Sequence, residues 1–298
     1  LVRGKYYHQT GERAKAEEDF QRAIRLNPNQ WEAYFAIGEM TYFDDVKAVE
    51  HYRKALSLTR GSEDQYIYYR LVTNYYIAGF GELAHRLYED YSTHQEVDSL
   101  TYYVLSGMND LMNDPESAAE NLRKAYAIDS TNPTHLFFAG ERMIAAGHFK
   151  KGLKDLRRYS ELCNRYGIIP HNTMHRIGYY LFQAGYKKEA EYYLDKQEEI
   201  CRRLIELDRP FAQRDFAQFD LAITYAFRGK QDKAIDQLKM IRNKPSVSLI
   251  ITGFIFTDPM LDSIRNDPEF QEIVNDLSIK YQAEHERIRQ WLEENDML

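Results

Sequence analysis

The sequence predicts an all-α protein, built as a solenoid of about seven helical hairpins and closed by a C-terminal helix. Three observations support this: a recurring spacing of small and aromatic residues, few β-branched or alternating segments, and only 8 prolines among 298 residues. Hydrophobic residues make up 44% of the chain and charged residues 29%, enough for a core with a hydrophilic surface. The 24 tyrosines and 15 phenylalanines indicate helices that pack through aromatic rings.

The first hairpin is predicted between Gly4 and Pro28. Gly4 permits a close approach of two helices, Gly11 suits the turn between them, and Asn27-Pro28 ends the unit. Between these points the spaced residues are Tyr7, Ala16, Phe20 and Ala23. They fall at helical intervals, so each helix presents one packed stripe to the other.

This spacing resembles the tetratricopeptide repeat, a 34-residue pair of antiparallel helices. Six further units follow, marked in turn by Ala48, Tyr52 and Ala55; Tyr75, Gly79 and Ala84; Tyr102, Ala118 and Leu122; Gly140, Gly147 and Leu156; Gly178, Gly185 and Ala190; and Leu221, Gly229 and Ala234. The resemblance covers about residues 1–245 and implies a right-handed solenoid. Residues 246–298 are predicted to form a half-repeat and C-terminal capping helices.

Two departures from the repeat affect its geometry. The turn glycines Gly147, Gly185 and Gly229 stand 38 and 44 residues apart, so we expect longer second helices in units five and six. The first unit lacks its opening turn, which predicts a chain cut from a longer one; a naturally short first helix is the alternative.

Two Asp-Pro pairs occur in the C-terminal segment, residues 246–298. Asp258-Pro259 and Asp267-Pro268 match helix starts, because Asp is a favoured N-cap and Pro is tolerated at the next position. The last helix carries a largely polar stretch from Gln282 to Arg289, so we expect it to dock at its start and project outward at its end.

The same tail resembles that of tetratricopeptide arrays in bacterial signalling polypeptides. This resemblance implies that the chain is part of a larger signalling or regulatory protein, in the cytoplasm. It also implies an alternative function, a ligand-sensing domain of a transcription regulator or signalling enzyme whose effector domain lies N-terminal to this chain.

In the repeat family, four positions of each first helix face a concave groove. The aromatic residues that map there are Phe35, Tyr42, Tyr66, Tyr69, Tyr76, Tyr103, Phe137, Tyr179, Phe182 and Phe219. Such rings suit an extended or helical peptide with apolar anchors; the alternative is that individual rings pack against neighbouring helices. Arg70, Arg142 and Arg176 lie beside these positions, where Glu39 and Glu141 are expected to neutralise nearby charge. The Lys and Asn that hold peptide carboxylates in chaperone-binding members are absent from these positions, which disfavours acidic C-terminal peptides.

We therefore predict a non-catalytic module that binds a protein or peptide. The C-terminal helix is a further occupant of the groove, from the same chain or from a second copy in a homodimer, with Trp291 and Leu292 as anchors. The net charge of −7 argues against nucleic acid, and the longest apolar run, Ser248 to Phe256, is too short to insert into a membrane.

No catalytic, cofactor or metal site is predicted. His171 and His175 have a spacing that zinc can use, but no third ligand is near in sequence. Cys163 and Cys201 occupy the same position in successive units and are expected to be buried free thiols. No phosphate-binding glycine loop and no nucleophile elbow is present.

Overall fold

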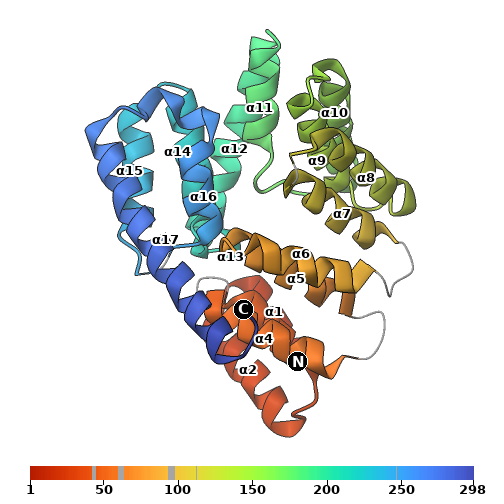
Figure 1. Ribbon diagram of the computed structural model, residues 1–298. Helices are drawn as coiled ribbons and strands as arrows, with labels where there is room; N and C mark the ends of the chain where they lie inside the picture. Colours follow the sequence, from red (N-terminus) through yellow and green to blue (C-terminus); the bar gives the residue numbers. More distant parts are fainter. Residues whose placement is uncertain (42–44, 60–63, 93–97, 112, 246) are drawn as a thin grey trace. The chain divides into compact units, whose positions relative to one another are not determined.

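The computed structural model describes residues 1–41, 45–59, 64–92, 98–111, 113–245 and 247–298 (Figure 1). Over this part of the chain the regular structure is entirely helical, with seventeen α-helices and one 3₁₀ helix. The predicted all-α class is confirmed.

Seven pairs of consecutive helices form hairpins, as the sequence predicts. They are α1 (Val2–Thr10) with α2 (Arg13–Leu26), α3 (Trp31–Met40) with α4 (Asp45–Leu58), α5 (Asp64–Ile77) with α6 (Gly81–Ser92), α7 (Ser99–Leu111) with α8 (Pro115–Ile128), α9 (Thr134–Ala145) with α10 (Phe149–Tyr166), α11 (Met174–Gln183) with α12 (Lys187–Glu206), and α14 (Phe216–Phe227) with α15 (Gln231–Arg242). The second helices α10 and α12 are 18 and 20 residues long, which confirms the predicted extension in units five and six.

The contacts divide the chain into two compact units. Unit 1 comprises residues 1–84 and 197–298, and unit 2 comprises residues 85–196. The division at residue 245 that the sequence suggests separates repeats from cap, and it stays a prediction.

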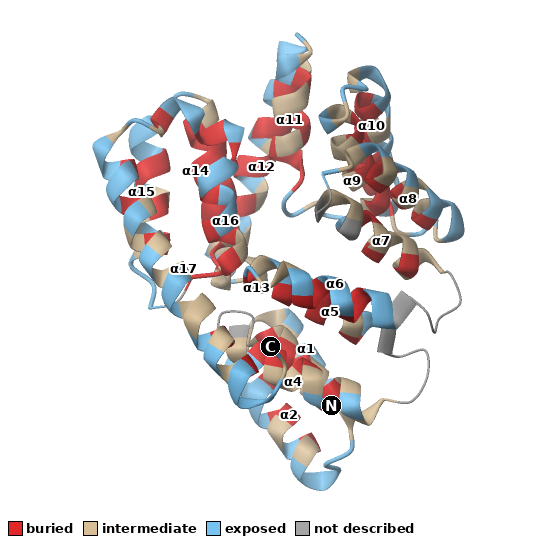
Figure 2. Cartoon of the chain, in the orientation of Figure 1, coloured by how far each residue is buried: buried red, intermediate tan, exposed pale blue. Residues whose placement is uncertain are grey.

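In four of the hairpins, α1–α2, α3–α4, α9–α10 and α11–α12, the two helices meet at a glycine of the first helix. A Cβ atom on Gly38 would lie 2.6 Å from the ring of Tyr52, and one on Gly4 would lie 2.7 Å from the ring of Phe20. At most 1% of either residue is exposed to solvent. Figure 2 shows that buried residues occur along helices throughout the chain. The missing side chain therefore lets an aromatic ring of the second helix lie against the backbone of the first.

The turn between the helices of a hairpin also depends on glycine. Gly11, Gly79, Gly147, Gly185 and Gly229 all have φ between +71° and +90°. This is the left-handed conformation that ends a helix at low steric cost only with glycine. The sequence-predicted turn positions are thus explained by backbone geometry.

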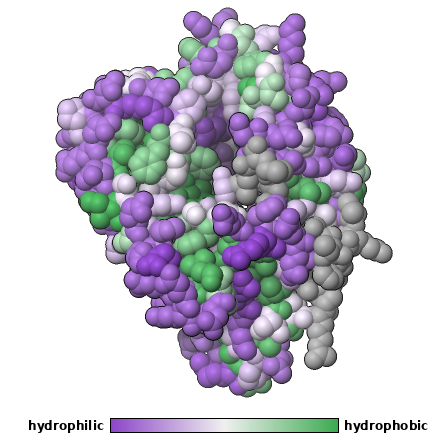
Figure 3. All heavy atoms as spheres, viewed as in Figure 1, coloured by the Kyte–Doolittle hydropathy of each residue, from purple (hydrophilic) through white to green (hydrophobic). Residues whose placement is uncertain are grey.

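After the last hairpin, unit 1 ends in three further helices, α16 (Leu249–Thr257), the 3₁₀ helix η1 (Pro259–Ile264) and α17 (Pro268–Glu294). A one-turn helix, α13 (Pro210–Gln213), precedes α14. Figure 3 shows hydrophobic residues reaching the surface over the part of unit 1 that holds α14 to α17. Phe254 and Phe256 of α16 and Ile279 of α17 are among its exposed apolar residues.

Both Asp-Pro pairs begin helices, as predicted. The carboxylate of Asp258 accepts a hydrogen bond from the Met260 amide at 2.9 Å, and that of Asp267 accepts one from the Glu269 amide at 2.8 Å. The first of these helices is a short 3₁₀ helix and the second is α17.

The expected outward projection of the last helix is wrong. Ile288 and Leu292, near the end of α17, are fully buried, and the helix packs against α4 as well as α15 and α16 (Figure 1). The reason is a narrow stripe: Tyr281, Ile288 and Leu292 fall on one face of an otherwise polar segment. A stripe of this width is enough to dock a helix whose other faces stay in water.

The glycine crossing yields a stability prediction. Gly38→Ala should destabilise the protein by about 1–3 kcal/mol, because the new methyl group overlaps the buried Tyr52 ring. Gly107→Ala is the matched control: Gly107 also lies inside a first helix, but a Cβ there meets nothing within 4 Å. The control should gain about 0.5–1 kcal/mol from helix propensity. Urea denaturation of both variants measures the difference; equal midpoints would contradict the tight crossing.

Candidate functional site

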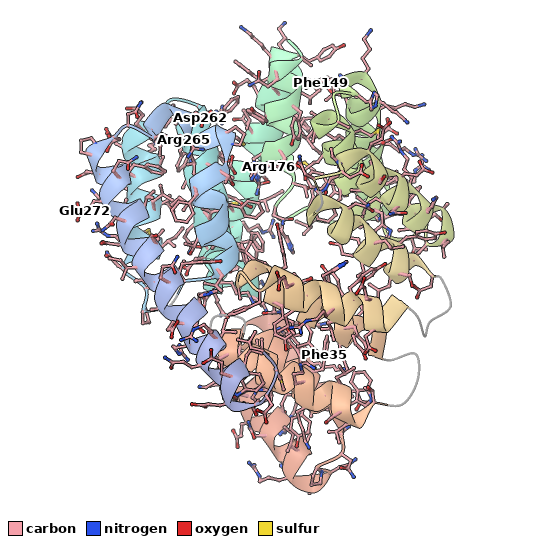
Figure 4. All side chains as sticks on the ribbon, in the orientation of Figure 1. Phe35, Phe149, Arg176, Asp262, Arg265 and Glu272 are labelled. Atoms are coloured by element: carbon pink, nitrogen blue, oxygen red, sulfur yellow. The ribbon has the colours of Figure 1, made fainter. Side chains whose placement is uncertain are left out.

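An aromatic cluster in unit 1 links the first helices of two successive hairpins. The Phe35 ring of α3 lies 6.0 Å from the Tyr66 ring of α5, nearly perpendicular to it, and Tyr66 is 6.2 Å from Tyr69. Phe35 also lies 6.4 Å from Trp31. Figure 4 shows Phe35 among the side chains of these N-terminal hairpins. The structure thus brings together three of the sequence-predicted residues, and Trp31 joins them.

Arg70 lies over this cluster and is paired. Its guanidinium carbon is 5.9 Å from the Tyr66 ring centre and 5.6 Å from that of Tyr69, and its Nη2 donates to the Glu39 carboxylate at 2.6 Å. Glu39 also accepts a hydrogen bond from the Tyr52 hydroxyl. Burial alone would lower the pKa of the Arg70 guanidinium, but the Glu39 carboxylate and the nearby tyrosines together raise it above its usual value. The predicted neutralisation by Glu39 is confirmed.

Two tyrosines of α5 remain accessible. Tyr66 is 53% exposed and Tyr76 is 50% exposed, while Phe35 and Tyr69 are half-buried. A tyrosine offers a large apolar ring and a hydroxyl with few rotatable bonds, which suits recognition of a peptide. Tyr42, also predicted for this face, lies outside the described residues.

Unit 2 contains a second cluster, in which an arginine again lies over an aromatic ring and pairs with an acidic residue. Tyr103 of α7 lies 6.0 Å from Phe138 of α9, and Arg142 of α9 lies 5.4 Å over Phe138. Arg142 also binds Asp110 of α7 with two nitrogens, at 2.9 and 2.5 Å. In both units an arginine therefore covers a ring of its own helix and pairs with an acid of the preceding first helix.

The remaining predicted rings divide by burial. Phe137 and Phe219 are each only 3% exposed, so they pack in the interior and offer no ring to a partner in this structure. Phe137 lies 5.3 Å from the buried Tyr159 ring. Phe182 is 36% exposed, with the Lys187 ammonium 5.5 Å over its ring.

On α11, Tyr179 and Arg176 are both partly buried. Tyr179 contacts its neighbour Tyr180, whose hydroxyl donates to Glu141 at 3.2 Å. Burial raises the pKa of Tyr180, and the nearby Glu141 carboxylate adds to this, while Arg176 opposes it. Arg176 therefore acts on the same small polar group as Glu141.

Sequence reasoning missed several residues of these clusters. Trp31, Phe138 and Tyr180 fall one position outside the four groove positions of their repeats. The pairing of Arg142 with Asp110 was also not predicted. The available signal was a separation of 31 or 32 residues between acid and arginine, close to one repeat.

The other residues that the sequence singled out show no reactive arrangement. His171 is exposed in the turn before α11, which begins at Met174, and His175 is buried within that helix. Among the residues that the structure describes, no three His, Cys, Asp or Glu side chains lie together as metal ligands.

The two cysteines are buried free thiols, as predicted. Burial raises the pKa of Cys163 and of Cys201, so both are held as unreactive thiols.

The helices described in the structure include none long and apolar enough to cross a bilayer.

Comparisons with known proteins agree with this fold. Residues 1–30 match the tetratricopeptide repeat family. The APC/C hetero-tetramer Cut9–Hcn1 is similar at a TM-score of 0.56 and 14% identity, over 92% of this chain and 48% of that one. A monomeric mutant of IFIT1 with Gppp-AAAA is similar at a TM-score of 0.58 and 13% identity, over 93% of this chain and 68% of that one. The human IFIT1 dimer with PPP-AAAA is similar at a TM-score of 0.57 and 12% identity, over 94% of this chain and 69% of that one. No curated protein sequence matches.

These findings confirm the resemblance to tetratricopeptide repeat proteins and an all-α solenoid fold of that type. The chain spans about half the length of the Cut9–Hcn1 chain that it matches. At identities this low, the likeness shows the fold alone.

The pairing of Arg70 yields a second prediction. Arg70→Met should destabilise the protein by about 1–3 kcal/mol, because Glu39 would lose its cation in a partly buried position. Lys15→Met removes a pair of similar length, to Glu12, whose side chains are exposed, and should leave the thermal midpoint unchanged. Thermal denaturation of the two variants side by side tests this. If both variants shift the thermal midpoint by the same small amount, the Arg70–Glu39 pair stabilises the protein no more than an exposed pair does.

Proposed function

We propose that this chain is a non-catalytic interaction module that binds a protein or peptide through the aromatic cluster of unit 1 (Trp31, Phe35, Tyr66 and Tyr69) and the exposed Tyr76 of α5. One observation carries the proposal: the first helices of successive hairpins place these rings on neighbouring helices, and two of the tyrosines are about half exposed. Stacked repeats of this kind provide extended surfaces for recognition.

The charges around the cluster favour an apolar ligand. Arg70 already pairs with Glu39, so an incoming carboxylate or phosphate would have to compete with a carboxylate 2.6 Å away. Aromatic rings, in contrast, gain contact area with any apolar anchor that covers them. We therefore propose an extended or helical peptide with apolar side chains as the ligand.

The tail resemblance supports a wider proposal, that this module serves a larger bacterial signalling or regulatory protein in the cytoplasm. In that setting the same cluster would bind a neighbouring domain or a regulatory ligand. The C-terminal helix of a second copy is disfavoured as the ligand, because Leu292, one of its two expected anchors, is buried against its own chain.

A peptide-selection experiment tests the binding surface. We expect a displayed random-peptide library to yield sequences rich in apolar residues. Combining Tyr69→Ala with Tyr76→Ala should weaken the binding of a selected peptide about tenfold or more, through loss of aromatic contact area. The helical circular dichroism signal should be retained, since both rings are at least partly exposed.

Tyr166→Ala with Tyr192→Ala is the matched control, since these tyrosines are 57% and 52% exposed but lie on the second helices α10 and α12. The control should bind like the unmodified chain. If both double variants lose binding equally, or if only a short triphosphorylated RNA binds, as IFIT1 does in its solved structures, the proposed surface is wrong.

A further inference from the structure

The second half of α17 covers a defined surface of unit 1. This surface consists of α4 and the turn from Ile77 to Phe80, between α5 and α6. The Tyr281 hydroxyl donates to the Ile77 carbonyl at 3.1 Å, and the His285 Nδ1 lies 2.6 Å from the Ala78 carbonyl oxygen. The His285 ring also stacks on Phe80, with centres 4.6 Å apart and planes 5° from parallel.

The surface is suited to receiving a helix. Ile77 ends α5, and the carbonyls at a helix end have no partner within that helix. Gly79, which follows Ala78 in this turn, has φ +90°, and a Cβ atom there would lie 3.2 Å from His285 Nδ1 and 3.3 Å from the Tyr281 hydroxyl. The turn therefore presents open acceptors, a flat ring and no obstructing side chain.

The residues that fill the surface form one stripe along α17. Tyr281, His285, Ile288 and Leu292 are spaced by 4, 3 and 4 residues, so they share one face of the helix. Ile288 and Leu292 are fully buried, and the two polar members are partly buried. A four-residue stripe of this kind is a recognition pattern that another helix could carry.

The two halves of α17 are held differently. The first half is tied to α15 by ion pairs, Lys239 to Glu269 at 2.9 Å and Arg242 to Glu272 at 3.1 Å. In the second half, Arg289 pairs instead with Glu286 and Glu293 of the same helix. The hydrogen bond from Arg289 lowers the pKa of the Glu286 carboxyl to about 2. These two pairs of Arg289 therefore lie within α17 and do not depend on its contact with the surface.

We propose that the surface of α4 and residues 77–80 is a helix-docking site, that α17 occupies it in cis, and that an amphipathic partner helix with the same stripe binds there when the end of α17 is released. The residues of the turn that contact α17, Ile77, Ala78 and Phe80, are not members of the aromatic cluster above, so each proposal can be tested without the other. While α17 occupies the site in cis, a partner can bind only the fraction of molecules in which the site is free. The apparent dissociation constant of the partner is therefore the intrinsic one divided by that fraction.

The test uses the full chain and a fluorescein-labelled peptide of residues 276–298. The double substitution Ile288→Asp and Leu292→Asp should release the end of α17, because it places two charges in an apolar contact. Hydrogen exchange should then rise over residues 281–298 and over the turn, and stay unchanged in α9 and α10. The labelled peptide should bind this variant about tenfold more tightly than the unmodified chain.

Phe80→Ala added to the released variant should weaken peptide binding, because the His285 ring loses its stacking partner. A peptide that carries the two aspartates is the matched control and should not bind either chain. If the aspartates unfold the chain, Tyr281→Phe with His285→Ala offers a milder release, expected to raise exchange only over residues 281–298 and the turn.

Two results would overturn the proposal. One is a variant whose α17 end is released, by hydrogen exchange, but which does not bind the peptide. The other is an unmodified chain that is a dimer and becomes a monomer on the double substitution, since the site would then hold α17 of a second copy rather than its own.

Discussion

The close crossing of two helices at a glycine is the constraint on which four of the seven hairpins depend. Gly4 and Gly38 lie against Phe20 and Tyr52 of the following helices. In unit 2 the crossing is tighter, because a Cβ on Gly152 of α10 would lie 2.5 Å from the Gly140 carbonyl oxygen of α9. This contact leaves no room for a side chain at Gly152. A crossing fixed at this distance also fixes the direction in which each first helix faces.

A second interaction recurs from one hairpin to the next. Arg70 pairs with Glu39, Arg142 with Asp110, and Arg157 with Glu189, and each pair is separated by 31 or 32 residues. Each pair connects a helix to its equivalent in the adjacent hairpin. The arginines beside the aromatic rings are thereby occupied, and the rings are left as the feature that an incoming ligand would meet.

The sequence predicts the local part of this structure well and the long-range part poorly. Hairpins, turn glycines and the Asp-Pro helix starts depend on residues fewer than forty positions apart, and a spacing pattern records them. The stripe on the α17 end indicates that it can dock but not where, because Tyr281 and His285 bind backbone carbonyls, which every residue has. The spacing pattern also does not predict which of the aromatic rings are buried and which are exposed. Phe137 and Phe219 occupy the same repeat position as Phe35 and Tyr69, which are only partly buried, and the packing around each ring distinguishes the two cases.

The same backbone contacts change how unit 1 holds together. In an open solenoid each repeat contacts only its neighbours, and stability is close to a sum over adjacent pairs. Here Gln213 donates to the Gly11 carbonyl and Tyr281 to the Ile77 carbonyl, across 202 and 204 residues of sequence. Arg214 donates likewise to the Glu39 carbonyl at 2.7 Å. Three first helices, α1, α3 and α5, thus receive side-chain donors at or just beyond their C-terminal ends, where the helix dipole favours positive and hydrogen-bonding groups. The hairpins at the start of the chain therefore depend on segments at its end, and unit 1 is stabilised as a closed set rather than as a row of neighbours.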